Sequence, residues 1–430
     1  MTARHPMEDY WGAIEDVDGV PGGAHPGRDA DHPYGVDFLC PWEDPFAGFP
    51  EHARRCAVAL DRAGVPVHLR SFDAASQLGD ALIPGQELVE ARVGRLLDVK
   101  IGQAVALVHM YVPTPTRLYN TVTHAKMDAD ELAVVNAHRV IYTVWERQNL
   151  PPTCAEPLNT VAQAWVACED NARMLVRGGV KPSKVRVIPC PYEDGDAHLA
   201  LDGRPQRDAR QPVVFYHIGK WEPRKEHDRI FGAFLCAFRP GEAVLYLKTS
   251  KYSPDWGVYP RDPMASIHEW LRQGTVIGNG WNLSNVNRGI RISREMLSFE
   301  RMVGIHRSGD VYVTLSRGEG FDMPALDAKL AGNLMVFVRE GGPADFYGEE
   351  DVAVEPTGTV LCNPGYQWEA DATYLDYSLN DAITAMRTAY EKVRAGKRCR
   401  GRDITPWSAP AVGAKMRACL EEIHGVKSFP

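Results

Sequence analysis

Residues 311–338 read VYVTLSRGEGFDMPALDAKLAGNLMVFV, and this stretch decides the fold class. The apolar run at 311–315 predicts a buried strand, and a loop with two glycines follows it. A helical pattern begins near Pro324 and ends at Gly332, because proline suits the first turn of a helix and glycine its end. The run at 334–338 predicts the next buried strand. Strand, loop, helix and strand in this order are typical of an α/β fold with a parallel sheet.

The loop between the first strand and the helix has the chemistry of a ligand site. A helix N-terminus presents free backbone N–H groups and the positive end of its dipole, which together bind phosphate. Gly318 and Gly320 allow a ligand to approach the backbone closely. Glu319 on the loop and Asp327 about one turn inside the helix are hydrogen-bond acceptors for sugar hydroxyls. Taken alone, the two acids also fit a helix cap and a solvated surface carboxylate.

A second segment, FYHIGKWEPRKEHDRIFGAF at 215–234, brings cations to the end of another predicted strand. Lys220, Arg224 and Lys225 follow the apolar run at 213–218. Open α/β sheets bind ligands at the carboxyl ends of their strands, and a diphosphate requires such positive charge. By itself the cluster is more typical of a solvated surface. Its place between a predicted strand and a predicted helix favours a ligand site.

The same alternation of apolar runs and helical patterns extends over most of the chain. Further strands are predicted at 65–69, 104–108, 140–144, 164–167, 185–188, 213–218 and 244–247. Helices are predicted at 51–62, 171–177, 224–238, 294–305, 379–393 and 409–423. The polar stretch at 193–212 predicts an exposed linker between two α/β halves. The expected organisation is a loosely ordered arm at 1–36, domains at 37–205 and 206–395, and a closing helical segment at 396–430.

Composition and charge are those of an ordinary globular protein. The 430 residues are 44% hydrophobic, and the formal net charge of -8 at pH 7 disfavours tight nonspecific binding to nucleic acid. The nine cysteines form no C-x-x-C pair, so reduced thiols are expected. No apolar run approaches the ~20 residues of a membrane span, and the start of the sequence has no secretion signal. We therefore expect a cytoplasmic protein without a membrane span.

The stretch E-G-F-x-M-P-x-x-D at 319–327 resembles the E-G-F-G-x-x-x-x-E signature of retaining glycosyltransferase family 4, in the GT-B superfamily. The resemblance implies two Rossmann-like domains with parallel sheets facing an interdomain cleft. It also implies that Glu319 lies beside the donor sugar and that Asp327 holds the nucleotide ribose. Asp327 is one methylene shorter than the usual Glu, and Asp322 stands where the family has Gly. Backbone amides expected near the diphosphate and sugar belong to Gly320, Phe321, Asp322 and Met323.

The basic segment matches a second motif of the same family. Gly219, Lys220 and Lys225 correspond to the family's G-R-x-x-x-x-K-G, whose cations clamp the β-phosphate of the donor. Lysine at 220 keeps the charge of the usual arginine and loses its bidentate geometry. Arg224 is a candidate to compensate for that loss.

Three segments of the first half also resemble the family. PFAGFPEHARRCAVALDRAGVPVHL at 45–69 implies that Gly48 and Phe49 approach the donor phosphate, and an ordinary surface turn is the alternative. ALVHMYVPTP at 106–115 implies that His109 contacts the acceptor or the donor sugar, unless it is a structural histidine. RVIYTVWERQNLPP at 139–152 resembles the segment T-x-W-E-x-x-x-L-P, which implies that Glu146 lies near the acceptor.

Together the resemblance covers about residues 38–395 and implies a retaining glycosyltransferase of the hexosyltransferase type. Such an enzyme requires neither a metal nor a cofactor, and it moves a sugar from a UDP-, GDP- or ADP-sugar to a hydroxyl. The acceptor is a glycan, a protein, a small molecule or modified DNA. Two alternatives stay open, a glycosyltransferase acting on hydroxymethylated DNA bases and a GT-B-like nucleotide-sugar epimerase or binding protein. The candidate catalytic residues are Glu319, Lys225, His109 and Glu146.

Overall fold

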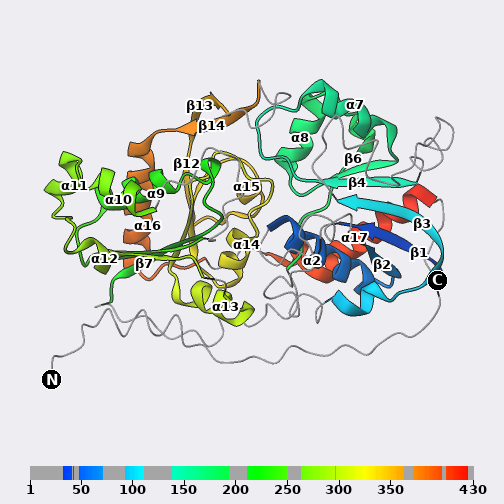
Figure 1. The fold of residues 1–430 in the computed structure, drawn as a ribbon, viewed down its shortest axis with the longest axis horizontal. Helices are drawn as coiled ribbons and strands as arrows, with labels where there is room; N and C mark the ends of the chain where they lie inside the picture. Colours follow the sequence, from blue (N-terminus) through cyan, green and yellow to red (C-terminus); the bar gives the residue numbers. More distant parts are fainter. Residues whose placement is uncertain are drawn as a thin grey trace. The chain divides into compact units, whose positions relative to one another are not determined.

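The computed structural model shows two compact α/β units (Figure 1). It describes residues 32–40, 42, 48–70, 93–110, 138–192, 211–249, 263–295, 297–362, 371–399 and 403–424. The N-terminal unit contains the described residues up to 192 together with 371–372 and 403–424. The C-terminal unit contains those of 211–362 and 373–399.

The N-terminal unit is built on a six-stranded parallel sheet. Its strand order is β2-β1-β3-β4-β5-β6, and all neighbouring strands are parallel. The order reverses between β1 and β3. The strands are β1 (His32–Leu39), β2 (Val67–Arg70), β3 (Ile101–Met110), β4 (Arg139–Thr143), β5 (Gln163–Val166) and β6 (Val185–Val187). The helices are α2 (Gly48–Arg62), α7 (Pro152–Thr160), α8 (Glu169–Arg177) and α17 (Ala409–His424), with the 3-10 helices η1 (Pro182–Lys184) and η5 (Thr405–Trp407).

The C-terminal unit contains a second six-stranded parallel sheet. Its order is β12-β11-β10-β7-β8-β9, which is the 3-2-1-4-5-6 order of the Rossmann fold with the reversal between β7 and β10. The strands are β7 (Val213–Ile218), β8 (Ala243–Lys248), β9 (Ile290–Ser293), β10 (Val311–Thr314), β11 (Leu334–Val338) and β12 (Val352–Val354). A separate antiparallel pair consists of β13 (Pro356–Leu361) and β14 (Thr373–Tyr377).

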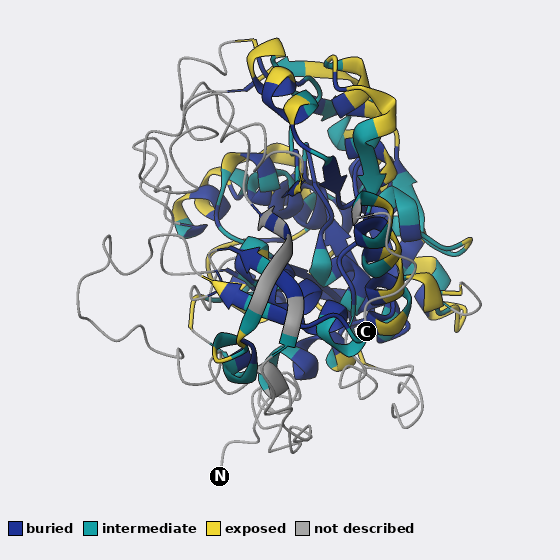
Figure 2. Ribbon diagram, turned by 90° about the vertical axis from the view of Figure 1, so that its right-hand side faces the viewer, coloured by how far each residue is buried: buried dark blue, intermediate teal, exposed yellow. Residues whose placement is uncertain are grey.

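Helices complete the layers of the C-terminal unit. They are the 3-10 helix η3 (Pro223–Lys225) and α9 (His227–Ala237), α10 (Pro263–Trp270), α11 (Gly274–Gly278), α12 (Val286–Gly289), α13 (Phe299–Ser308), α14 (Met323–Leu330), α15 (Pro343–Phe346) and α16 (Leu379–Arg394). Every residue of β7, β10 and β11 is buried, as expected for parallel strands covered on both faces. Figure 2 shows buried residues along the strands inside the molecule and many exposed residues on helices and turns.

Helix α17, from the end of the chain, packs against α2 near its beginning (Figure 1). Val412, Met416 and Leu420 are fully buried in the same core cluster as the apolar residues of α2. The two helices approach closely, because a Cβ added at Gly413 would lie 2.2 Å from the carbonyl oxygen of Ala59. The N-terminal unit therefore takes part of its core from the last described helix.

The apolar runs predicted the sheets well. The strands predicted at 213–218 and 334–338 coincide with β7 and β11, and each of the other seven predicted strands overlaps an observed one. The sequence did not predict β1, β9 or β12–β14. The prediction of a loose arm at 1–36 was wrong at its end, because β1 begins at His32 and lies between β2 and β3. Backbone hydrogen bonds with β2 and β3 offset the weak strand preference of the proline and glycine in β1. Residues 1–31 lie outside the described residues.

Two predicted helices begin later than expected. The helix predicted at 224–238 starts at His227, because η3 and a left-handed Glu226 (φ 53°) precede it. The helix predicted at 294–305 starts at Phe299, where the Ser298 side chain accepts a hydrogen bond from the backbone N–H of Arg301. The first of these shifts places Arg224 and Lys225 on a separate turn beside the helix. Most of the predicted linker, 193–210, lies outside the described residues.

Candidate functional site

The reversal of strand order in the C-terminal unit positions a candidate site. Strands β7 and β10 are neighbours, with Phe215 opposite Val311 and Tyr216 opposite Tyr312. In open α/β sheets, ligands bind at the carboxyl ends of the two strands that flank such a reversal. The loop after β7 leads to η3, and the loop after β10 leads to α14. Both motifs found in the sequence therefore lie at this edge of the sheet.

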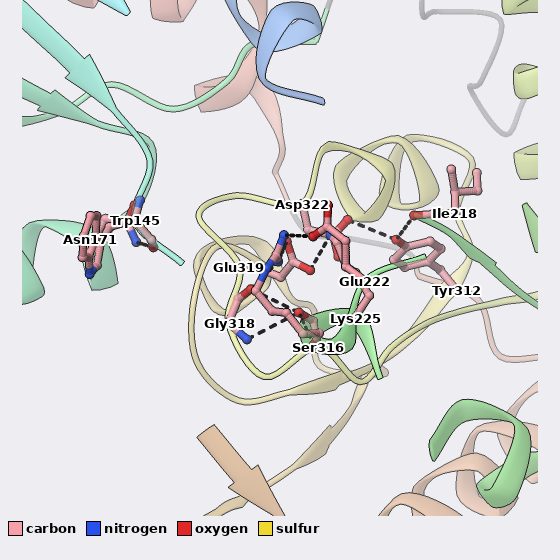
Figure 3. A network of polar contacts seen from close by, with 11 residues as sticks. Trp145, Asn171, Ile218, Glu222, Lys225, Tyr312, Ser316, Gly318, Glu319 and Asp322 are labelled. Carbon is pink, nitrogen blue, oxygen red and sulfur yellow. Dashed lines mark hydrogen bonds and ion pairs between the residues drawn. The ribbon is translucent and has the colours of Figure 1, made fainter. Parts of the chain in front are cut away.

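A buried ion cluster joins the two loops (Figure 3). Lys225 Nζ lies 2.6 Å from Glu319 Oε1, and Arg224 Nη1 lies 3.3 Å from Glu319 Oε2. Arg224 Nη1 also donates to the carbonyl oxygen of Gly318 at 2.5 Å, and Arg224 Nη2 pairs with Glu222 at 3.2 Å. The side chain of Glu319 is only 6% exposed and that of Lys225 14%. The cluster thus brings together a buried acid and two cations, all of which the sequence resemblance assigned to the sugar donor.

The charge state of Glu319 follows from its surroundings. Burial alone would raise the pKa of its carboxyl, but the positive charges of Lys225 and Arg224 outweigh burial and lower this pKa to about 2. Glu319 is therefore ionised at neutral pH. An ionised carboxylate accepts hydrogen bonds and donates none, which suits it to bind hydroxyl groups.

Backbone contacts hold the two loops together. The backbone N–H of Arg317 donates to the carbonyl oxygen of Arg224 at 2.9 Å. Arg317 Nε also pairs with Glu226 Oε1 at 2.7 Å, and Arg317 Nη2 lies 3.4 Å from Asp376 on β14. Burial raises the pKa of Glu226, and the charges of Arg317 and Arg229 oppose this effect. These contacts fix the cations of one loop relative to the acid of the other.

A pair of glycines supports the acidic loop from behind. Gly341 has φ +76°, a conformation that side chains rarely adopt, and the backbone N–H of Gly342 donates to the carbonyl oxygen of Glu319 at 3.2 Å. A Cβ at Gly342 would lie 2.1 Å from the carbonyl oxygen of Phe321. Because Gly341 and Gly342 have no side chains, the turn after β11 can lie directly against the backbone of 319–321.

Asp322 occupies the N-cap position of α14 in an unusual conformation. Its φ of 66° and ψ of 71° are left-handed, and its side chain makes no capping hydrogen bond. Its Oδ1 instead accepts a hydrogen bond from the hydroxyl of Tyr312 at 3.0 Å. Pro324 lies in the first turn of α14, as the sequence predicted. The sequence did not predict the contact with Tyr312, because it depends on how the loop after β10 folds back onto that strand.

Four further predicted donor residues lie in the same unit. Gly219 and Lys220 directly follow β7 and are half-buried, and Lys220 forms no ion pair with any residue that the structure describes. Asp327 is half-buried on α14, and Met323 is the first residue of that helix. Sequence analysis missed Lys248 at the end of β8, beside Gly219. Its burial lowers the pKa of its ammonium to about 8, and its Nζ donates to the carbonyl oxygen of Thr249 at 2.7 Å.

The N-terminal unit holds the remaining candidates. Gly48 begins α2, and the half-buried Phe49 packs against the core. His109 lies next to the last residue of β3, and its side chain lies outside the described part of the structure. Glu146 is half-buried after β4, next to Trp145. Asn171 on α8 fixes this turn, because its amide accepts from the backbone N–H of Trp145 at 2.7 Å and donates to its carbonyl oxygen at 2.8 Å.

Within the described ranges, no group of three or more His, Cys, Asp or Glu side chains is arranged to hold a metal ion. None of the helices described is both long and apolar enough to cross a bilayer.

Two Rossmann-like units with parallel sheets define the GT-B fold, and solved structures of that fold resemble the chain over most of its length. Anabaena Alr3699/HepE in complex with UDP and glucose gives a TM-score of 0.51 at 11% identity, covering 91% of this chain and 100% of that one. Sucrose-phosphate synthase from Thermosynechococcus elongatus gives 0.50 at 15%, covering 92% and 100%. The apo lipopolysaccharide outer core galactosyltransferase WaaB gives 0.52 at 11%, covering 90% and 99%.

These similarities confirm the predicted fold class, an α/β protein of the GT-B type. No protein-family model and no curated protein sequence matches the chain.

Proposed function

We propose that this protein is a glycosyltransferase that moves a sugar from a nucleotide-diphosphate sugar to a hydroxyl of an acceptor. The observation that carries the proposal is the buried Glu319, which Lys225 and Arg224 hold at the edge of the sheet where β7 and β10 end. Among the structures that share the fold, Alr3699/HepE was solved with UDP-glucose, and WaaB is a galactosyltransferase. In this proposal the cations Lys225 and Arg224 bind the diphosphate, and the neighbouring Glu319 binds hydroxyl groups of the sugar.

The cations of the loop after β7 would bind the diphosphate. An ammonium has three N–H donors, so Lys225 can keep its contact with Glu319 and also donate to a phosphate oxygen. Lys220 has no ion pair within the described residues and is available for the same ligand. Backbone N–H groups at the start of α14, beginning near Phe321 and Met323, add donors and the positive end of the helix dipole. Such groups stabilise charge on the leaving diphosphate as the sugar bond breaks.

Finer features of the reaction rest on the likeness of residues 319–327 to the family 4 signature. On that basis the reaction retains the configuration of the anomeric carbon and requires no metal, with a leaving-group oxygen helping to take the proton of the acceptor. Gly48 and Phe49 would approach the phosphate, and His109 and Glu146 would contact the acceptor or the sugar. NMR of the freshly formed product would distinguish retention from inversion.

A thermal-shift screen against UDP-, GDP- and ADP-sugars tests the proposal. A ligand that binds only the folded state stabilises it by about 2.7 kcal/mol when its concentration is 100 times Kd, and the melting temperature then rises. We expect one nucleotide series to raise Tm and the other two to raise it less. Release of free nucleotide diphosphate only with an acceptor would then distinguish a transferase from an epimerase. No stabilisation by any member of the three series would contradict the proposal.

Asp327→Asn is expected to weaken nucleotide binding more than it slows the chemical step. The residue lies half-buried one turn inside α14, where the family signature has the acid that holds the ribose. A neutral amide accepts hydrogen bonds from ribose hydroxyls less strongly than a carboxylate does. Isothermal titration of the nucleotide diphosphate and steady-state kinetics at saturating donor measure the two effects. Unchanged affinity for the nucleotide would rule out the ribose contact.

A further inference from the structure

Asp322 has a hydrogen-bonding capacity that the fold leaves unused. The residue is only 7% exposed. Its Oδ1 accepts from Tyr312, but its Oδ2 is buried without a hydrogen-bond partner among the residues described. A buried acceptor left unsatisfied costs about 1–3 kcal/mol, and more when it is charged. Native proteins seldom leave such an atom unsatisfied without a reason, and a ligand that supplies a donor is one such reason.

The carboxyl of Asp322 faces the ion cluster and does not cap the helix. A carboxyl at an N-cap ordinarily accepts hydrogen bonds from the first backbone N–H groups of its helix, and here it makes none. Figure 3 shows Asp322 next to the Lys225 and Glu319 pair, on the side of Tyr312. The left-handed backbone at Asp322 accounts for this direction. Such a conformation strains most residues, although aspartate tolerates it better than bulky ones do.

We propose that Oδ2 of Asp322 recognises the transferred sugar by accepting a hydrogen bond from one of its hydroxyl groups. This inference rests on the proposed function and adds a residue that contacts the sugar of the donor. An ionised carboxylate repels phosphate and accepts from hydroxyls, so Asp322 belongs with the uncharged part of the donor. The two cations, Lys225 and Arg224, then bind the diphosphate. The two acids, Glu319 and Asp322, bind the sugar.

The charge state of Asp322 makes the recognition dependent on pH. Burial and the negative charge of Glu319 raise the pKa of its carboxyl to about 6, against the opposing effects of Lys225 and of hydrogen bonding by Tyr312. The nearby Thr314 hydroxyl also lowers this pKa. Thr314 Oγ1 and Asp322 Oδ2 nevertheless form no hydrogen bond with each other or with another described residue. Above pH 6 the carboxylate accepts from a sugar hydroxyl, and below it the carboxyl is protonated. Binding of the sugar part should therefore weaken as pH falls through about 6.

Asp322→Gly is the direct test, because glycine adopts φ 66° without strain and the loop can keep its conformation. Isothermal titration of UDP, GDP and ADP, and of UDP-glucose, GDP-mannose and ADP-glucose, gives the gain in affinity that each sugar adds. For the nucleotide that binds, we expect the variant to bind the diphosphate at least as tightly as the wild type, because a negative charge near the phosphates has been removed. Its affinity for the sugar nucleotide should fall about tenfold to a hundredfold, the range expected for a lost hydrogen bond to a charged group.

Asp322→Asn supplies the test by pH. The amide does not titrate, and neither do the esterified phosphates of a sugar nucleotide between pH 5 and 8. The affinity of Asp322→Asn for the sugar nucleotide should therefore not fall as pH is lowered from 8 to 5, whereas that of the wild type declines below about pH 6. Asp381→Asn, on the exposed surface of α16, is the matched control for the loss of one negative charge and should behave as the wild type.

Three outcomes would overturn the inference. Equal affinities of the wild type and Asp322→Gly for the sugar nucleotide would show that Oδ2 does not contact the sugar. A parallel loss of affinity for diphosphate and sugar nucleotide would show that Asp322 only shapes the loop. Failure of the wild type to bind any of the six ligands would contradict the proposed function itself, and with it this inference.

Discussion

Lys225→Met is expected to reduce turnover by about 2–4 kcal/mol of transition-state stabilisation, or roughly 30-fold to 900-fold. The ammonium of Lys225 lies 2.6 Å from Glu319 in a site that is largely shielded from water. There it would neutralise the charge that develops on the departing diphosphate, which is greatest in the transition state. The loss should therefore fall mainly on kcat, and the KM of the donor should change less.

Lys415→Met is the control for this prediction. Lys415 is exposed on α17, and its replacement should leave turnover within about twofold of the wild type. Circular dichroism of both variants checks the fold, because removal of Lys225 leaves Glu319 with Arg224 as its nearest cation. Similar turnover in the two variants would exclude Lys225 from the binding of the leaving group.

Asp351→Asn is expected to destabilise the C-terminal unit by about 3–5 kcal/mol. Asp351 and Lys329 form an ion pair in which their side chains are 0% and 1% exposed. Asp351 also accepts hydrogen bonds from the backbone N–H groups of Met335 at 2.7 Å and Gly348 at 2.6 Å. An asparagine removes the charge, and so leaves the ammonium of Lys329 buried without its counterion. Urea denaturation followed by circular dichroism measures the effect.

The ion pair of Arg339 with Glu355 provides a matched control for the buried pair. Its side chains are 41% and 64% exposed, so Glu355→Gln should cost at most about 1 kcal/mol. Equal shifts of the urea midpoint in the two variants would show that burial does not distinguish the pairs. The buried pair also bears on the site, because Lys329 belongs to α14 and Asp351 precedes β12. Its loss should loosen the helix whose first turn is proposed to bind the donor.

The sheets were predictable because their strands are continuous apolar runs. Residues 213–218 and 334–338 are buried throughout, as expected for strands of a parallel sheet that is covered on both faces. Strand β9 escaped prediction because IRIS is short and alternates apolar and polar residues. Strand β13 escaped because its residues are half-buried or exposed and pair only with β14. These strands form because they pair with distant segments of the chain, and the local sequence pattern does not predict such pairing.

The candidate site was predictable in its residue types and unpredictable in its contacts. Glu319 and Lys225 were assigned to one donor from their places after two strands and from the resemblance to the family 4 motifs, and the structure brings their side chains within 2.6 Å. The left-handed backbone at Glu226 and Asp322 has no clear signal in the sequence, because both residues ordinarily prefer other conformations. Each conformation persists because surrounding contacts hold it, such as Arg317 against Glu226 and Tyr312 against Asp322.

The packing of α17 on α2 has a consequence for biosynthesis. Helix α2 has an apolar face that α17 covers, and the C-terminal unit lies between these two helices in the sequence. Until Val412, Met416 and Leu420 have emerged, that face is exposed to water or to chaperones. The N-terminal unit therefore completes its core only after the C-terminal unit has been translated, and a chain that stops at residue 402 would lack the helix that covers α2.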